Sequence, residues 1–196
     1  NITSLFGSYE MDADGVRPEP SVTLVKNGIL KGFLSSRTPM AGTNASTGSN
    51  RFGIDPNNPS AFIAPGSLHI TSDEHMNREE LMAALRKSAQ AEGMGYAYIV
   101  RKIGGSTPFL YRYDLETGVE TLVHSAEISN VALNSLRRVL GVSANEEITN
   151  YLYRDRIPVS VIHPASILIE DIEIYKSSNL NRETEEILAN PLKRRE

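Results

Sequence analysis

The dipeptide Asn27-Gly28 constrains the fold most, because it separates two apolar runs that are rich in β-forming residues. The first run covers residues 22–26 and the second covers residues 29–34. A two-residue type I′ turn needs positive φ at both central positions, which Asn and Gly tolerate best. We therefore predict a β-hairpin over residues 22–34.

The rest of the chain alternates short β-type runs with turn signals and has few helical stretches. A helix is predicted from Asn77, where Glu80 stands three residues on as in a capping box, to Gly93, which favours a helix end. Shorter helices are predicted over residues 131–140 and 181–188. Strands are predicted over residues 62–64, 68–70, 96–100, 109–113, 119–123, 159–162, 167–169 and 172–174. This order predicts an α+β fold of mostly antiparallel β-sheet, barrel- or sandwich-like, with two or three short helices.

The composition excludes several classes of function. None of the 196 residues is a cysteine, which excludes disulfides, thiolate nucleophiles and cysteine-bound metal sites in this chain. The net charge is −4 and the basic residues are scattered, so nucleic acid is not expected as a partner. No stretch is long and apolar enough to predict a membrane span. The polar residues 36–60 predict a long structureless loop, either functional or disordered, and residues 178–196 predict a flexible tail.

The four histidines do not form a metal-binding pattern. His69 and His75 enclose two acidic residues, and we interpret this stretch as a polar loop before a helix rather than as a metal site. His124 follows an apolar run, which favours a core or interface position. His163 precedes a proline at a strand break, where it could face a cleft. No serine lies in a Gly-x-Ser-x-Gly elbow, so no complete catalytic site is predicted.

Paired side chains elsewhere have structural interpretations. Glu146-Glu147 is expected on a solvated polar face. Four tyrosines on neighbouring predicted strands could stack on bases, but without a basic groove we favour packing within the sheet. These are Tyr96, Tyr98, Tyr111 and Tyr113.

Several segments, in their order and spacing, carry a family resemblance. They are residues 12–16, 22–34, 36–37, 47–51, 128–130, 136, 139–140, 158–161 and 164–174. Together they resemble the C-terminal domain of the TldD/PmbA (TldD/TldE) family of zinc metallopeptidases, also labelled modulators of DNA gyrase. The resemblance implies that one subunit type binds zinc through His-Glu-x-x-x-His on a helix plus a cysteine of the C-terminal domain. It also implies cleavage of flexible peptides and maturation of some antibiotic peptides.

The chain departs from this pattern at the metal ligand. The family's cysteine would fall near Asn150 or Tyr151, and no cysteine is present. We therefore expect either a subunit of the non-metal-binding type or a divergent member with other ligands. No catalytic, cofactor-binding or metal-binding residue is predicted in this chain. Zinc is expected only if the full-length protein carries the family's metal motif.

These observations lead to one functional hypothesis and one alternative. Residues 1–196 are expected to be the C-terminal domain of a longer metallopeptidase whose N-terminal part is missing, and to serve as scaffold, substrate-cleft wall or subunit interface. The alternative is a non-catalytic peptide- or protein-binding partner subunit with vestigial peptidase ancestry. The cleft residues predicted are Arg37, Asn150, Tyr151, Arg154, Asp155 and His163.

The expected partners follow from the same resemblance. They are a flexible peptide, held by strand addition to a sheet edge, and a related or identical subunit. The family implies a cytoplasmic location, while the missing native N-terminus leaves export open. The chain alone is expected to be inactive.

Overall fold

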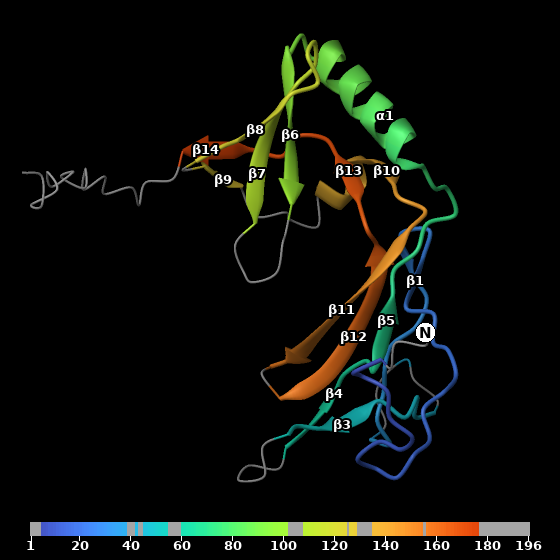
Figure 1. Ribbon diagram of the computed structural model, residues 1–196. Coiled ribbons are helices and arrows are strands. Elements are labelled where there is room, and N and C mark those ends of the chain that lie inside the picture. Colours follow the sequence, from blue (N-terminus) through green and yellow to red (C-terminus); the bar gives the residue numbers. More distant parts are fainter. Residues whose placement is uncertain are drawn as a thin grey trace, which may run out of the picture. The chain divides into compact units, whose positions relative to one another are not determined.

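The protein is described here by a computed structural model, in which the chain forms two compact units (Figure 1). The structure describes residues 5–38, 42, 45–54, 60–101, 108–124, 126–128, 135–154 and 156–176. Unit 1 contains Asn1–Asn77 and Val142–Ile167, and unit 2 contains Arg78–Gly141 and Leu168–Glu196. In the described part the strands form several small, mostly antiparallel sheets and no closed barrel, which confirms the α+β class.

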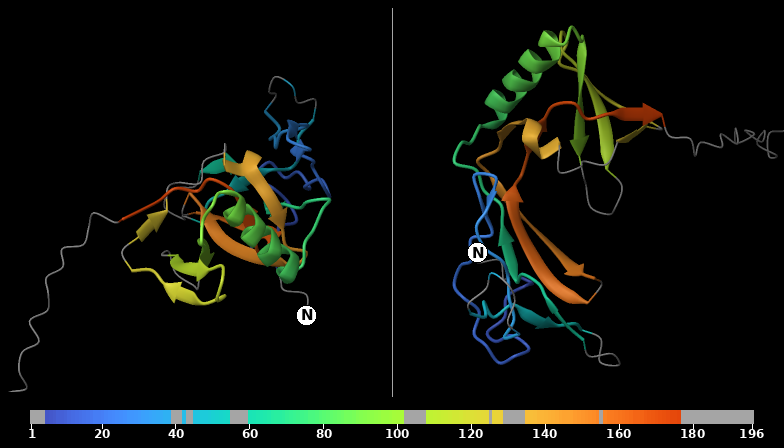
Figure 2. Two further views of the ribbon diagram at one scale, coloured as in Figure 1. Left: turned by 90° about the horizontal axis from the view of Figure 1, so that it is seen from above. Right: turned by 180° about the vertical axis from the view of Figure 1, so that it is seen from behind.

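The main sheet of unit 1 has three strands in the order β11-β12-β5. β11 (Glu146–Tyr153) and β12 (Ile157–Pro164) form a long antiparallel hairpin, and β5 (Ser67–His69) pairs with β12 in parallel (Figures 1 and 2). The register runs from Glu146 opposite Pro164 to Tyr153 opposite Ile157. We call β11 and β12 the edge hairpin, because β11 is an outer strand. β12 was predicted in part and β11 was not predicted.

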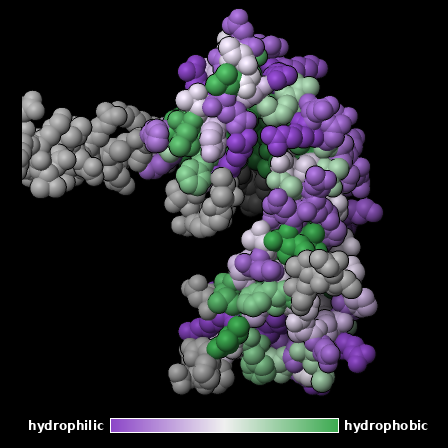
Figure 3. All heavy atoms as spheres, in the orientation of Figure 1, coloured by the Kyte–Doolittle hydropathy of each residue, from purple (hydrophilic) through white to green (hydrophobic). Residues whose placement is uncertain are grey.

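The core of unit 1 lies against one face of this sheet. Ala64, Ile157 and Val159 are fully buried, and Phe62, Tyr153 and Val161 pack around them. Ile157 and Val159 are two residues apart in β12, so their side chains lie on the same face of the sheet. Figure 3 shows that apolar residues also reach the surface of unit 1 around β11, β12 and β4 (Ala61–Ile63).

The predicted Asn27-Gly28 hairpin is confirmed. β1 (Val25–Lys26) and β2 (Ile29–Leu30) pair, and Asn27 and Gly28 have φ values of 54° and 73°, as a type I′ turn requires. We call this element the Asn-Gly hairpin. Its ladder is short and its apolar side chains are exposed, with Ile29 at 59%.

The prediction of a structureless loop over residues 36–60 is wrong in part. β3 (Asn50–Phe52) lies within this range and pairs with β4. The loop's polar residues satisfy one another: the Ser35 N–H donates to Thr47 Oγ1 at 2.7 Å, and Ser49 N donates to Ser35 O at 3.3 Å. Ser35 is fully buried, so the composition that suggested disorder instead forms an internal hydrogen-bond network.

Unit 2 contains the predicted long helix and meander. α1 (Arg78–Ala91) begins after Asn77 and carries two acidic residues in its first turn; Gly93 follows with φ 72° and ends it. β6 (Tyr96–Arg101), β7 (Phe109–Asp114) and β8 (Glu120–Leu122) form an antiparallel sheet in sequence order. Both predictions are confirmed. None of the helices in the described ranges is long and apolar enough to cross a membrane.

The remaining elements correct the prediction of a helix over 131–140. The described part of this range contains a 3₁₀ turn, η1 (Ser135–Arg138), and then the start of β10 (Val139–Val142). β10 pairs with β13 (Ile167–Ile169), and β9 (Ala126–Ile128) pairs with β14 (Ile174–Lys176). β14 begins at the last residue of the predicted strand 172–174. The predicted helix 181–188 and tail 178–196 lie outside the described residues.

Candidate functional site

The hydrogen bonds of β12 determine which main-chain groups of β11 point outward. Ser160 N donates to Gly66 O, and Ile70 N donates to Ile162 O, both at 2.9 Å. The main-chain N–H and C=O groups of the even-numbered residues of β12 therefore point toward β5, and those of the odd-numbered residues point toward β11. Pro158, which has no N–H, fits this parity because it does not have to donate to β11.

In the antiparallel register each odd residue of β11 lies opposite an odd residue of β12. The main-chain groups of Thr149 and Tyr151 are thus hydrogen-bonded to β12, whereas the main-chain groups of the even residues of β11 point away from β12. The N–H and C=O groups of Glu146, Ile148, Asn150 and Leu152 form what we call the β11 edge. No strand in the described part of the chain pairs with the β11 edge.

The β11 edge is long and partly apolar. β11 has eight residues, and all but Tyr153 are exposed. Ile148 and Leu152 are 41% and 42% exposed. Exposed edge strands of this kind invite pairing with another chain, and monomeric proteins usually block them. No proline or lysine lies in β11 to do so.

A short chain of hydrogen bonds fixes the side chain at the centre of this strand. The Gly7 N–H donates to Ser160 Oγ at 3.0 Å, and the Ser160 hydroxyl donates to Asn150 Oδ1 at 2.6 Å. Asn150 lies opposite Ser160 in the register. Because Ser160 is fully buried, water does not compete for its hydroxyl.

Gly7 can take part only because it has no side chain. A Cβ at this position would lie 1.8 Å from the Gly66 carbonyl oxygen. In turn, a Cβ on Gly66 would lie 2.6 Å from a ring carbon of Tyr9. The N-terminal segment therefore runs in direct main-chain contact with the turn that precedes β5.

A buried arginine holds this region together, and we call its contacts the Arg51 clamp. Arg51 is 7% exposed; its Nη1 donates to Pro65 O at 3.2 Å and its Nη2 to Pro158 O at 3.3 Å. The guanidinium lies 3.9 Å from the centre of the Tyr9 ring, and the Tyr9 hydroxyl donates to Gly48 O at 2.6 Å. Burial lowers the pKa of Arg51 and raises that of Tyr9.

The structure places most of the predicted cleft residues on the edge hairpin, where they are spread along its length and do not gather at one point. Four of them belong to the edge hairpin: Asn150 and Tyr151 in β11, Arg154 in the connecting turn and His163 in β12. Asp155 lies outside the described residues. Arg154 has φ 51°, and its guanidinium lies 5.0 Å from the centre of the Phe62 ring. The β11 edge was not predicted, because β11 lacks a two-residue apolar alternation, and nothing in the sequence marked Ser160 or Gly7 as part of the site.

Arg37 serves a different part of unit 1. Its N–H donates to Asp14 Oδ2 at 3.0 Å, and its Nη1 donates to Asp14 O at 3.2 Å. The Arg37 N–H and the Asn50 side chain together lower the pKa of Asp14. Asp12 Oδ1 accepts from the N–H groups of Asp14 and Val16, which stabilises the turn at residues 12–15. We therefore assign Arg37 to this turn.

Two of the four histidines, His69 and His163, make pairwise contacts. His69 Nε2 lies 2.6 Å from Glu146 Oε1 on the surface. His163 Nδ1 donates to Pro164 O, and its Nε2 is hydrogen-bonded to the Thr149 hydroxyl, both at 2.9 Å. His124 is exposed, so the core position expected for it is wrong, and the interface position stays a prediction. Across the described ranges no three potential metal ligands come together. The described residues thus do not fit zinc, which needs about three protein ligands at a catalytic site.

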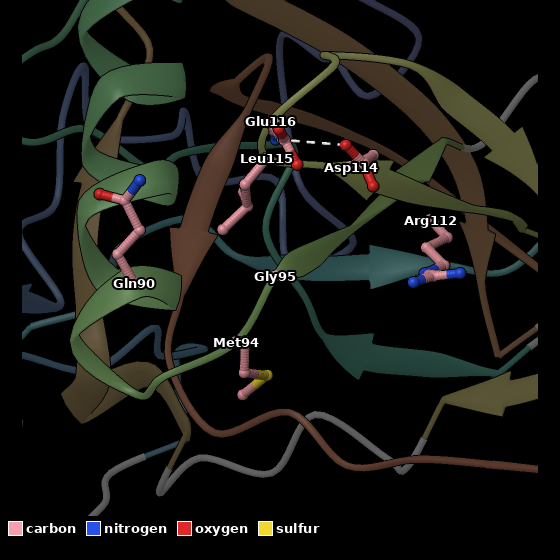
Figure 4. Close-up of a pocket in the computed structure, with 7 residues that line it drawn as sticks. All are labelled: Gln90, Met94, Gly95, Arg112, Asp114, Leu115 and Glu116. Carbon is pink, nitrogen blue, oxygen red and sulfur yellow. Dashed lines mark hydrogen bonds between the residues drawn. The ribbon is translucent and has the colours of Figure 1, made fainter.

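Unit 2 has an open depression beside α1, lined by two acidic residues, and one of them, Asp114, is already hydrogen-bonded within the chain (Figure 4). Asp114 Oδ1 accepts from the N–H groups of Glu116 and Thr117, and also from the Thr117 hydroxyl. The Thr117 bonds lower the pKa of Asp114 most. The carboxylate therefore stabilises a turn.

The tyrosines of unit 2 pack against arginines of the same unit. The Arg112 guanidinium lies 4.5 Å from the centre of the Tyr96 ring, and that of Arg101 lies 4.9 Å from the Tyr111 ring. Arg101 also pairs with Glu120. Such cation–π contacts occupy the aromatic faces.

The structure thus defines a mostly β domain with one unpaired eight-residue edge and no assembled metal centre in its described part. The profile of one family, the PmbA/TldA metallopeptidase C-terminal domain, matches residues 1–176. The chain belongs to this family, which confirms the resemblance stated from the sequence. Neither a curated protein nor a solved structure matches it significantly.

Proposed function

We propose that this domain forms one wall of a peptide-binding cleft, and that an extended peptide pairs with the β11 edge. The observation that carries the proposal is the parity of the edge hairpin, which directs the main-chain groups of four alternate β11 residues away from β12. Strand addition supplies affinity through such main-chain hydrogen bonds. A flexible peptide fits because it can become extended without disrupting a fold of its own.

Membership of a metallopeptidase family supports a peptide as the occupant. We expect any hydrolysis to be completed by residues outside this chain, since no three potential zinc ligands come together among the described residues. The chain alone is expected to bind no stoichiometric zinc and to cleave no peptide. Elemental analysis and a peptidase assay of the purified chain check both expectations, and stoichiometric zinc or cleavage would contradict this division of roles.

The absence of cysteine favours a second candidate function. A non-catalytic partner subunit would hold the peptide, or a related subunit, with the same edge while another chain performs the chemistry. Zinc analysis of the longest natural polypeptide that contains this chain separates the two. Stoichiometric zinc there supports a catalytic parent, and its absence supports the partner subunit.

Binding at the β11 edge can be tested with a proline substitution. Ile148→Pro removes one outward N–H and leaves the bonds to β12 intact, because the Ile148 N–H does not face β12. Affinity for an uncharged, unstructured peptide of about 12 residues should fall about tenfold or more, measured by fluorescence anisotropy. Ile148→Ala keeps the N–H and should lose less.

The control lies in the Asn-Gly hairpin. Ile29→Ala removes another exposed apolar side chain of unit 1 and should leave the affinity unchanged. Equal affinities of Ile148→Pro and the wild type would contradict strand addition at this edge.

A further inference from the structure

The side-chain amide of Asn150 is oriented. Its Oδ1 accepts the Ser160 hydroxyl proton at 2.6 Å, so its Nδ2 is directed away from Ser160. No acceptor among the described residues is bonded to Nδ2. Asn150 is exposed, and its own main-chain groups belong to the β11 edge. The two N–H bonds of the Asn150 side-chain amide are thus available for hydrogen bonding beside the unpaired β11 edge.

Ser160 prevents this amide from turning over. The Ser160 oxygen accepts from the Gly7 N–H, and its single proton goes to Asn150. A flipped amide would place its NH₂ group against Ser160 and leave the hydroxyl proton without its acceptor. Because Ser160 is fully buried, losing that acceptor would carry the cost of an unsatisfied buried donor.

We propose that the Asn150 amide is a binding group for a carbonyl of the peptide main chain, and that Ser160 is the residue that positions it. This inference rests on the proposed function, since the peptide must lie along the β11 edge. An extended peptide presents a carbonyl at every second residue toward its neighbour. The NH₂ group of Asn150 donates to such an oxygen, and as a donor it cannot bind an N–H group of the peptide.

The decisive variant is Asn150→Asp, which changes the donor and preserves the shape. Its carboxylate can still accept from Ser160, but it presents an oxygen where the NH₂ group stood. Affinity for the uncharged peptide should fall about three- to tenfold, the effect of about one hydrogen bond. Asn145→Asp adds the same charge at an exposed position just before β11 and should leave the affinity unchanged.

A double-mutant cycle tests the positioning role of Ser160. Ser160→Ala should weaken binding in the wild-type background and have no effect in an Asn150→Ala background, because no amide is then left to orient. A purely structural role would weaken binding equally in both. Thermal unfolding of each variant identifies any loss of fold caused by the unsatisfied Gly7 N–H; the Asn150→Asp result does not depend on it.

The outcomes distinguish the inference about the Asn150 amide from the proposal that a peptide pairs with the β11 edge. A wild-type chain that does not bind the peptide, or that binds it equally after Ile148→Pro, overturns both. Binding that is sensitive to Ile148→Pro but equal for Asn150→Asp and Asn145→Asp overturns the inference and leaves the edge-binding proposal standing. A selective loss in Asn150→Asp supports both.

Discussion

Unit 1 contains two hairpins that differ in how the sequence encodes them. The Asn-Gly hairpin has a two-residue turn whose positive φ values match its residues, yet each of its strands has only two residues. The edge hairpin pairs eight residues on each side around a turn without such a signal. The first is thus specified by local turn chemistry, and the second by contacts distant in sequence, among them the Arg51 clamp and the Gly7–Ser160 bond.

The Arg51 clamp should give the largest difference between the two hairpins. Arg51→Met removes the donors to two carbonyl groups in the buried region around β12. The free energy of unfolding should fall by about 3 kcal/mol, since buried hydrogen bonds to charged groups contribute about 1.5–3 kcal/mol each. Ile29→Ala in the Asn-Gly hairpin should cost less than about 1 kcal/mol, because its side chain is exposed.

Urea unfolding measures both values. Equal destabilisation by the two substitutions would mean that the clamp does not support the edge hairpin.

Two glycine substitutions should give an intermediate difference in unfolding free energy between the two hairpins. Gly7→Ala forces the main chain away from Gly66, because the new Cβ would lie 1.8 Å from its oxygen. Gly28→Ala meets no neighbour but must adopt φ 73°. We expect about 2 kcal/mol or more for Gly7→Ala and about 1 kcal/mol for Gly28→Ala.

Peptide affinity separates the two glycines further. It should fall only in Gly7→Ala, since Gly7 supports Ser160 and through it Asn150. A loss of affinity in Gly28→Ala would contradict the separation of the two hairpins.

The smallest expected effect is a pH dependence that arises from the clamp. Burial raises the pKa of Tyr9 above its ordinary value of about 10. The folded state therefore holds this proton more tightly, and the stability it contributes is present below pH of about 10 and is lost as the pH rises through the folded pKa. Burial also raises the pKa of Tyr98, so Tyr98 contributes to the pH dependence of the unfolding free energy with the same sign.

Tyr9→Phe should therefore lessen the fall in unfolding free energy above pH of about 10. Urea unfolding at several alkaline pH values checks this. An identical slope in the variant and the wild type would show that Tyr9 does not titrate in a folding-linked manner.

The elements that were predicted correctly are those specified by caps, turns and strand patterns within a short stretch of sequence. The capping pattern at Asn77, the glycine stop at Gly93 and the meander of β6, β7 and β8 were predicted from residues close in sequence. β11 was missed because its partner side chains lie on β12, and its apolar residues Ile148, Tyr151 and Leu152 do not alternate. Its formation depends on pairing that a window of sequence does not contain.

The candidate site was predicted in part for the same reason. The family resemblance indicated Asn150 and Tyr151, and the structure places both on the outer strand of the edge hairpin. Ser160 and Gly7 gave no signal, because a buried serine and a glycine in close main-chain contact look like any polar turn residues in a sequence. Their role follows only from a hydrogen bond between residues 153 positions apart.

Amide hydrogen exchange along β11, followed by NMR with and without the unstructured peptide, reports strand addition residue by residue. If the peptide pairs with the β11 edge, it slows exchange at Ile148, Asn150 and Leu152, whose N–H groups point outward, and leaves Thr149 and Tyr151 unchanged, since these already bond to β12. Unchanged exchange at the even residues of β11 at a saturating peptide concentration would contradict this pairing.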